Sequence, residues 1–435
     1  GKILLFLRRI VKISVSVDGK HIYTIEKSII NKERYFDEVS LLKNNEETSQ
    51  WIVKNFDSIA IDSKTHFSLK DDEKTPIKLK EAEFTEISFA ARIENEKIKP
   101  LDREDSPIFT YLPTKVIDFE FPFLVNGNFL TTTNRQEIHT DRIWNQWLFR
   151  IIAENSFKWL ELLAKSKFKY QVLSLLPNKQ NHYQNLLKVC FDEEFDKFCK
   201  KSRFILSKEN NLKCAKEIIV DNTELSRLPF IDSETLVLYI NQINETNFKS
   251  DSFANGELVH INKLHSIGAT FFELENLEEF FKSQVFKEAH DLNDNPLLIE
   301  FFYNQTGNGT NIEWNARLQD VPFIYAKGKK LRSPKTLCFP SIDFQTEFGG
   351  KVSVIHSKTY SFLEKNEKIK NWLEKLGVKE PSDISYLENE ILPNLDKLVY
   401  KNNYKIITRY IFNLHKKNKL NNIHYQNLGG FKLLC

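Results

Sequence analysis

The sequence has few of the residues that build disulfide frameworks, zinc sites and low-complexity chains. Its 435 residues include five cysteines, 13 glycines, 13 prolines and no methionine. The number of cysteines is odd and no Cys-x-x-Cys pair occurs, which disfavours a zinc ribbon or a disulfide framework and indicates a reducing, cytoplasmic compartment. The modest glycine and proline content excludes collagen-like and low-complexity chains.

Long hydrophobic runs are also missing. The longest, residues 3–7, is far shorter than the roughly 20 residues that a membrane-spanning helix needs. Arg8, Arg9 and Lys12 follow this run, whereas a signal peptide has its basic residues before the apolar stretch. Lysine and arginine number 62 against 59 for aspartate and glutamate, so the net charge is only +3. We expect no membrane segment, and we do not expect nucleic acid as a partner.

The chain is rich in hydrophobic residues, at 41%, and phenylalanine alone contributes 35. At roughly 150 residues per domain, a chain of this length is expected to form two to four domains. Its abundance of Asn, Lys, Ile and Phe is typical of an AT-rich bacterial genome. Because it starts with Gly1 and lacks methionine, we expect it to be a piece of a longer protein.

Residues 1–130 are predicted to be rich in β-structure. Apolar and polar residues alternate over 11–17, an Asp-Gly pair follows at 18–19, and a second apolar stretch follows at 22–25, a pattern typical of a β-hairpin. The polar stretch 64–80 is predicted to be a loop. Further strands are predicted at residues 51–53, 84–93, 109–112 and 119–130. Pro122 places the last of these at a sheet edge or a bulge.

Helices are predicted from three- and four-residue spacings of apolar side chains. The first covers 141–165, with Asp141 as its N-cap and Trp144, Trp147 and Trp159 in the core. A second covers 180–200 and carries Cys190 and Cys199, which are expected to be buried structural thiols. Further helices are predicted at 274–289, from Pro296, at 368–376 with Gly377 as the C-cap, at 386–392 and at 400–414.

A short internal repeat links residues 204–216 and 323–335, which align without a gap. Each copy has an apolar stretch, a polar turn, a leucine and basic residues, and both are predicted to be β-hairpins. Residues 428–434 are a candidate start of a third copy. The basic run 327–332 is expected to be a solvated hairpin tip, and contact with phosphate is the alternative.

These patterns predict an α+β fold. A sheet-rich domain at 1–165 ends in the tryptophan-rich helix. An α+β module with the duplicated hairpins occupies 166–345, and a helical module occupies 346–435. No phosphate-binding GxxxxGK[ST] or GxGxxG motif occurs, and the ten histidines form no metal-binding pair, so no metal site is expected.

One segment is more specific. Pro122, Val125, Asn126, Gly127 and Phe129 form a Pro-x-x-Val-Asn-Gly-x-Phe strand, which is followed by a threonine-rich loop with an arginine and then by Trp-Asn-x-x-Leu at 144–148. This pattern resembles the sacsin family and the related NO VEIN-like proteins. The resemblance extends more weakly over most of the chain.

The same stretch is similar to the catalytic loop of the middle domain of heat-shock protein 90, where an arginine reaches the γ-phosphate of ATP. The resemblance implies that Arg135 contacts this phosphate and that Asn134, Gln136 and Glu137 form the supporting loop. A planar, permanently charged guanidinium suits the charge that develops during phosphoryl transfer. The alternative, that Arg135 caps or salt-bridges the following helix, stays open.

The family's ATP pocket is built by an upstream domain with Glu-x-x-x-Asn and Asp-x-Gly-x-Gly motifs, which do not occur here as a set. The resemblance therefore implies that ATP and Mg²⁺ are bound by that upstream domain, the chain's expected partner, and that this chain alone binds neither. It would be part of a large sacsin-like, heat-shock-protein-90-like ATPase, with residues 1–165 as its transducer region. It would couple ATP binding and hydrolysis in the upstream domain to a chaperone-like or defence-related conformational change, and its client is unknown. A non-enzymatic interaction scaffold is the alternative.

Overall fold

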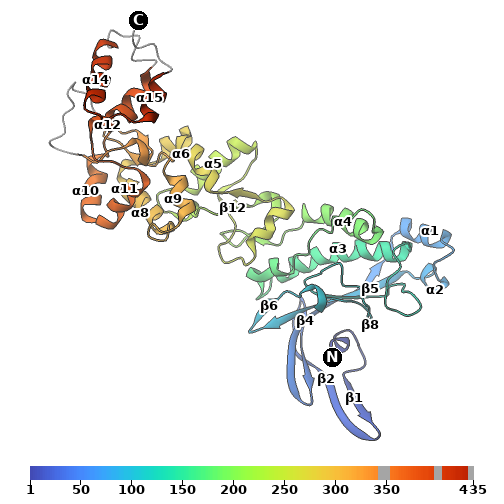
Figure 1. Ribbon diagram of the computed structural model, residues 1–435. Coiled ribbons are helices and arrows are strands. Elements are labelled where there is room, and N and C mark those ends of the chain that lie inside the picture. Colours follow the sequence, from blue (N-terminus) through green and yellow to red (C-terminus); the bar gives the residue numbers. More distant parts are fainter. Residues whose placement is uncertain (341–352, 396–403, 430–435) are drawn as a thin grey trace. The chain divides into compact units, whose positions relative to one another are not determined.

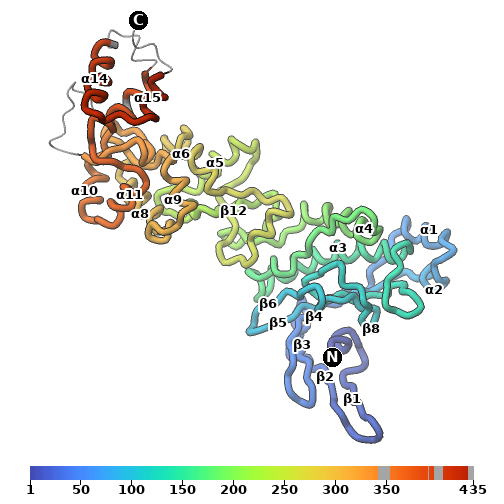
Figure 2. Tube along the Cα trace, viewed as in Figure 1, coloured from blue at the N-terminus to red at the C-terminus, as the bar shows by residue number. Residues whose placement is uncertain are grey.

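The computed structural model describes residues 1–340, 353–395 and 404–429. The chain divides into two compact units: unit 1 is Gly1–Asp221 with Phe248–Phe271, and unit 2 is Asn222–Asn247 with Phe272–Cys435. A large N-terminal sheet is followed by mainly helical structure, an α+β fold, which confirms the predicted class (Figures 1 and 2). The three-part division at 165 and 345 stays a prediction. None of the described helices is both long enough and apolar enough to cross a membrane.

A sheet of nine strands forms the first half of unit 1. Its strands run in the order β1-β2-β3-β4-β5-β9-β7-β8, and β6 pairs with β5 beside this path. The strands are β1 (Lys12–Val17), β2 (Lys20–Lys32), β3 (Asp37–Lys43), β4 (Glu46–Ala60), β5 (Phe84–Glu94), β6 (Lys97–Lys99), β7 (Ile108–Thr110), β8 (Leu112–Pro113) and β9 (Leu124–Gly127).

The hairpin predicted at the start of the sheet is confirmed. β1 and β2 pair antiparallel through a two-residue turn in which Asp18 and Gly19 both have positive φ, at 49° and 75°. This conformation is the one that an Asp-Gly pair adopts most readily between twisted strands. The predicted strands at 51–53 and 84–93 lie within β4 and β5.

Two predictions for this region are wrong. The stretch 119–130 is not an edge strand: only β9 is a strand, and it lies inside the sheet between β5 and β7. Pro122 precedes β9 and so removes no ladder hydrogen bond. The stretch 64–80 contains two helices, α1 (Ser63–Asp71) and α2 (Ile77–Lys80), because Asp62 caps α1 by accepting the Thr65 backbone N–H at 2.9 Å.

The central strands are buried on both faces. Along β5, Phe89 and Ala91 join one core cluster while Ala90 joins the other, and Ile52 and Val53 of β4 divide in the same way. The first cluster lies under the helices, and the second is closed by the 3₁₀ turn Lys2–Leu5. Alternation along each strand therefore fixes the register on both sides.

Helix α3 (Ile143–Leu163) packs on the first face, with α4 (Leu186–Cys199) beside it (Figure 1). All three tryptophans of α3 are buried, as predicted. The predicted N-cap is wrong: α3 begins after Arg142, which makes no side-chain cap, and Asp141 pairs with Lys74 at 3.3 Å. Cys190 and Cys199 are buried on α4, and burial raises the pKa of both thiols.

Unit 2 is mainly helical. Its predicted helix at 274–289 is divided by Ser283, which caps the second half through the Phe286 N–H. Gly377 ends α11 with φ at 115°, which confirms that C-cap. The helices are α5 (Ser233–Asn244), α6 (Leu277–Lys282), α7 (Gln284–Ala289), α8 (Asn295–Gln305), α9 (Ile312–Leu318), α10 (Ser357–Lys365), α11 (Glu367–Leu376), α12 (Asp383–Tyr386), α14 (Tyr404–Lys416) and α15 (Asn422–Gly429).

The internal repeat is confirmed as a pair of hairpins. In unit 1, β10 (Ile205–Leu206) pairs with β11 (Leu212–Lys213), and in unit 2, β14 (Ile324–Tyr325) pairs with β15 (Leu331–Arg332), in the same register. A 3₁₀ turn follows each hairpin, at Ala215–Glu217 and Pro334–Thr336. The possible third copy lies outside the described residues from residue 430 onward.

The duplication reaches beyond the hairpins, into module 1 (residues 204–221 and 253–270) and module 2 (323–339 and 353–379). In each module a later segment returns to the hairpin and to the strand that follows it. Four backbone N–H to O bonds of module 1 recur in module 2: Ser207–Asn211 and Ala326–Lys330, Lys208–Phe253 and Lys327–Val354, Ala254–Ile219 and Ile355–Cys338, Asn255–Leu206 and His356–Tyr325.

Candidate functional site

The predicted arginine loop connects β9 to α3 and is closed on itself. Thr131 and Ile138 form an antiparallel bridge, and the Thr132 N–H donates to the Glu137 carbonyl at 3.0 Å. From outside, the Lys115 N–H donates to the Gln136 carbonyl at 2.8 Å. The loop is therefore a small, ordered hairpin.

The loop is fixed to α3 by Asn145, whose side chain is fully buried. Its Oδ1 accepts the Leu130 N–H, and its Nδ2 donates to the carbonyls of Leu130 and His139, each at 2.8 Å. One amide therefore holds both ends of the loop. The neighbouring Trp144 donates its indole N–H to the Asn128 carbonyl at 2.7 Å. These contacts give the Trp-Asn pair a structural role.

The strand part of the motif is structural as well. Asn126 is buried and accepts the Tyr111 N–H at 2.9 Å, which fixes the turn between β7 and β8. A side chain at Gly127 would approach the Phe129 ring to 3.2 Å, so a larger residue would need that ring to move. The motif residues around the loop thus have identifiable packing or hydrogen-bond partners.

Arg135 differs from these neighbours. It lies at the exposed turn of the loop with φ at 58°, a conformation that non-glycine residues adopt uncommonly. Its N–H donates to the Thr132 carbonyl at 2.8 Å, while its guanidinium has no ion pair or hydrogen bond within the described ranges. Among the described residues, the Arg135 side chain therefore neither caps α3 nor forms an ion pair with it.

The other predicted site residues divide by role. The Asn134 Oδ1 accepts from the Thr132 hydroxyl at 2.7 Å and from the Gln136 N–H at 3.0 Å, so this side chain stabilises the turn. Gln136 and Glu137 contribute backbone groups to the loop, and their side chains are exposed. The loop thus brings the four residues together. The side chains of Arg135, Gln136 and Glu137 are open to a partner.

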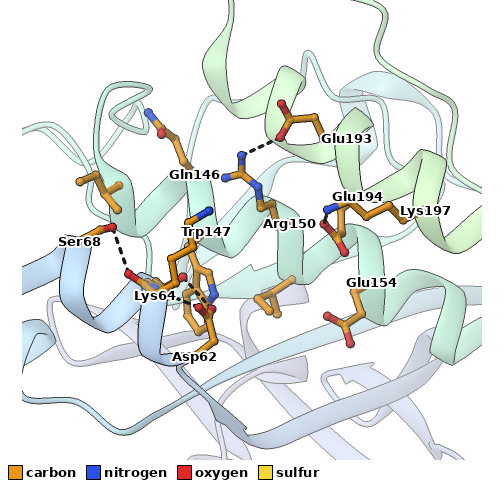
Figure 3. Close-up of a pocket in the computed structure, with 13 residues that line it drawn as sticks. Asp62, Lys64, Ser68, Gln146, Trp147, Arg150, Glu154, Glu193, Glu194 and Lys197 are labelled. Carbon is orange, nitrogen blue, oxygen red and sulfur yellow. Dashed lines mark hydrogen bonds and ion pairs between the residues drawn. The ribbon is translucent and has the colours of Figure 1, made fainter.

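A cleft of about 480 Å³ lies beside the first turns of α3 (Figure 3). Asp62, Lys64 and Ser68 line it on one side, and the opposite wall comes from α3 and α4. Gln146 connects the cleft with the arginine loop, since it lines the cleft and donates to the Thr140 carbonyl at 3.1 Å.

Four of the charged groups of this cleft neutralise one another in pairs. Arg150 contacts Glu193 and Lys197 contacts Glu194, both at 2.7 Å (Figure 3). Burial acts to raise the pKa of Asp62, but hydrogen bonds from Thr65 and the Trp147 indole outweigh it and lower that pKa. The cleft therefore presents little net charge of either sign. No group of three or more potential metal ligands occurs in the described residues.

No model of a known protein family matches the chain, and no curated protein or solved structure matches it significantly. The sacsin-like assignment therefore rests on the motif residues and stays a prediction.

Sequence reasoning identified the arginine loop but missed what holds it. Neither the double anchor at Asn145 nor the backbone contact from Lys115 was expected, because both depend on loops meeting in three dimensions. The available signal was Asn145 itself, which lies next to a core tryptophan at the start of a predicted helix. A buried amide requires several hydrogen-bond partners.

Proposed function

We propose that the chain is the transducer segment of a large sacsin-like, heat-shock-protein-90-like ATPase. In this proposal, an upstream domain binds ATP and Mg²⁺, and Arg135 contacts the γ-phosphate there. Helix α3 follows the arginine loop directly and carries the change in that contact to the rest of the chain. The client, and a chaperone-like or defence-related outcome, belong to the same proposal.

The observation that carries the proposal is the exposed guanidinium of Arg135, which has no partner among the described residues, on an anchored loop. Fixing both ends of the loop through Asn145 holds the backbone of Arg135 in place, and this reduces the entropy lost when its side chain binds. The free, buried thiols of Cys190, Cys199 and Cys214 support a cytoplasmic location.

We expect Arg135→Ala, made in a protein that includes the upstream domain, to slow ATP turnover by about 10³-fold or more, as for a lost arginine finger. ATP binding should change much less, because the contact strengthens in the transition state. Arg135→Lys should recover little of the rate, since a lysine lacks the planar, multi-donor group. Steady-state turnover and equilibrium nucleotide binding measure the two effects.

Arg103→Ala is the matched control, because Arg103 is an exposed arginine of the same unit whose contact with Glu120 is a surface pair at 3.6 Å. Turnover should be unaffected by it. If Arg135→Ala leaves turnover unchanged as well, Arg135 is not part of the catalytic machinery.

One observation favours the interaction scaffold as a second candidate function. Apolar side chains of the β1–β2 hairpin and its flanks are exposed, and β1 is an edge strand of the sheet. Exposed apolar groups beside an open edge are typical of a protein-binding surface. The side chains are Ile10, Val11, Val17, Ile22, Ile29 and Ile30. An Arg135→Ala variant with unaltered turnover would favour this candidate.

A further inference from the structure

The two modules have the same backbone hydrogen bonds but opposite chemistry at the hairpin tip. In module 1 the tip reads Lys208, Glu209, Asn210, Asn211. The matching positions of module 2 are Lys327, Gly328, Lys329 and Lys330. An acidic residue and two amides are thus replaced by a glycine and two lysines.

The returning segment changes in the same direction. The residue that bonds back to the hairpin is Asn255 in module 1 and His356 in module 2, and two positions later Glu257 is matched by Lys358. Burial lowers the pKa of His356, and the nearby charges of Lys329 and Lys358 lower it further. The tip and the returning segment therefore create one region of positive potential.

The charges of the tip are not used by the fold, whereas Lys358 of the returning segment donates to the Asn293 Oδ1 at 2.7 Å. Lys327, Lys329 and Lys330 are exposed and have no ion pair in the described part of unit 2, and the same holds for Arg332, which is half-buried. Lys213, which occupies the position of Arg332 in module 1, contacts Asp251 at 2.7 Å. Because module 1 forms the same hairpin without the extra lysines, the basic tip of module 2 is not required by the backbone.

The turn itself favours a smaller polar residue. Lys329 has φ at 53° and occupies the position of Asn210, which has φ at 62°. Asparagine tolerates this left-handed conformation better than lysine does. A lysine there costs a little stability, which is understandable if its charge has a use.

We propose that the tip of module 2, residues 327–332 with His356 and Lys358, binds the phosphate backbone of a nucleic acid without reading its sequence. Lysine contacts to phosphate position a protein on nucleic acid without base recognition. The expectation that nucleic acid is not a partner rested on the net charge of the whole chain. A local basic surface is compatible with that small total, because the net charge is a sum over the whole chain.

An acidic polypeptide is the competing partner, and the surroundings of the tip disfavour it. Protein interfaces concentrate binding energy in buried aromatic or apolar anchors surrounded by polar groups. None of the described residues of module 2 has an exposed large apolar side chain, so the tip lacks such an anchor. Phosphate contact needs no such anchor.

The test is binding of the full 435-residue chain to two fluorescently labelled 20-base-pair DNA duplexes of unrelated sequence, measured by anisotropy between 50 and 200 mM salt. We expect similar affinity for both and a steep loss of affinity with salt. The exchange variant Gly328→Glu, Lys329→Asn, Lys330→Asn gives module 2 the tip of module 1. It should weaken binding by about tenfold and reduce the salt slope by about two, near one for each lost phosphate contact.

The exchange variant should fold, because a side chain at Gly328 meets nothing within 4 Å and asparagine suits the φ of position 329. Lys365→Asn with Lys368→Asn is the control, since it removes two exposed lysines of unit 2 away from the tip and should leave binding unchanged. Three results would overturn the proposal: no binding at 50 mM salt, equal loss in control and exchange variants, or binding to poly-glutamate as tight as to DNA.

Discussion

At the scale of single residues, Asn145 fixes the connection between the sheet and α3. It is buried, and it satisfies one N–H and two carbonyl groups at the two ends of the arginine loop. A buried polar group without its partner costs about 1–3 kcal/mol. The amide therefore stabilises the sheet-to-helix connection well beyond the contribution of a surface hydrogen bond.

We predict that Asn145→Ala lowers the free energy of unfolding by about 3 kcal/mol, because the Leu130 N–H and the His139 carbonyl lose their partner. The Leu130 carbonyl still accepts the His139 N–H at 3.1 Å. The matched control is the next residue, Gln146, which is not buried and makes one bond to the Thr140 carbonyl, so Gln146→Ala should cost about 0.5 kcal/mol. Urea unfolding followed by tryptophan fluorescence measures both values. Equal costs would show that the loop is held by other contacts.

At the scale of elements, the two modules end a helical turn in the same way. Gly268 and Gly377 both have positive φ, at 84° and 115°, and the residue after each donates back to the turn, from Ala269 to Leu264 and from Val378 to Leu373. Such a left-handed cap satisfies carbonyl groups at a helix end. The two glycines differ in their surroundings. A Cβ added at Gly268 would meet nothing within 4 Å, whereas one added at Gly377 would meet the backbone of Lys335.

We therefore predict unequal costs for the same substitution. Gly268→Ala should destabilise the chain by about 1 kcal/mol, through backbone strain alone. Gly377→Ala should cost about 3 kcal/mol, because its φ is less favourable and the new methyl group would lie 3.3 Å from the Lys335 Cα. Chemical unfolding of the two variants checks the order. A larger cost at Gly268 would contradict the steric argument.

Element types were predictable where local chemistry decides them. The Asp-Gly hairpin, the tryptophan-rich helix and the Gly377 cap all follow from short-range patterns and are confirmed. The interior position of β9 was not predictable, because it depends on a parallel partner, β7, that comes earlier in the chain. The exposure of Arg135 could not be predicted either, since nearby carboxylates such as Glu137 offered an ion pair that the folded loop does not form.

At the scale of the whole molecule, unit 2 contains a buried titratable side chain, His290. In unit 2, His290 stacks against Phe286 and Tyr325, with ring centroids 4.7 and 5.7 Å apart. Neither of its ring nitrogens has a hydrogen-bond partner within the described ranges. Burial lowers the pKa of His290 from 6.5 to about 4.

We predict that acid destabilises unit 2 through this histidine. The unfolded chain takes up the proton near pH 6.5, whereas the folded unit takes it up only near pH 4, so stability present above pH 6.5 is lost as the pH falls through this window. Between pH 7 and pH 5 the loss should be about 2 kcal/mol. Urea unfolding at both pH values should show this loss for the wild-type chain and not for His290→Phe.

The control for this experiment is His182→Phe, which changes an exposed histidine of unit 1 and should keep the full acid dependence. If His290→Phe retains the same loss between the two pH values, other groups are responsible for it.

The duplicated bonding scheme also has a consequence for how the chain reaches its native state. The returning segment of one module has the backbone geometry to pair with the hairpin of the other, and such cross-pairing is a characteristic failure of chains that contain repeats. The side chains at equivalent positions, Leu206 against Tyr325 and Ser207 against Ala326, differ in size and polarity. Because of this divergence, the returning segment of one module fits the hairpin of the other poorly. The differences between the two copies therefore disfavour cross-pairing during folding.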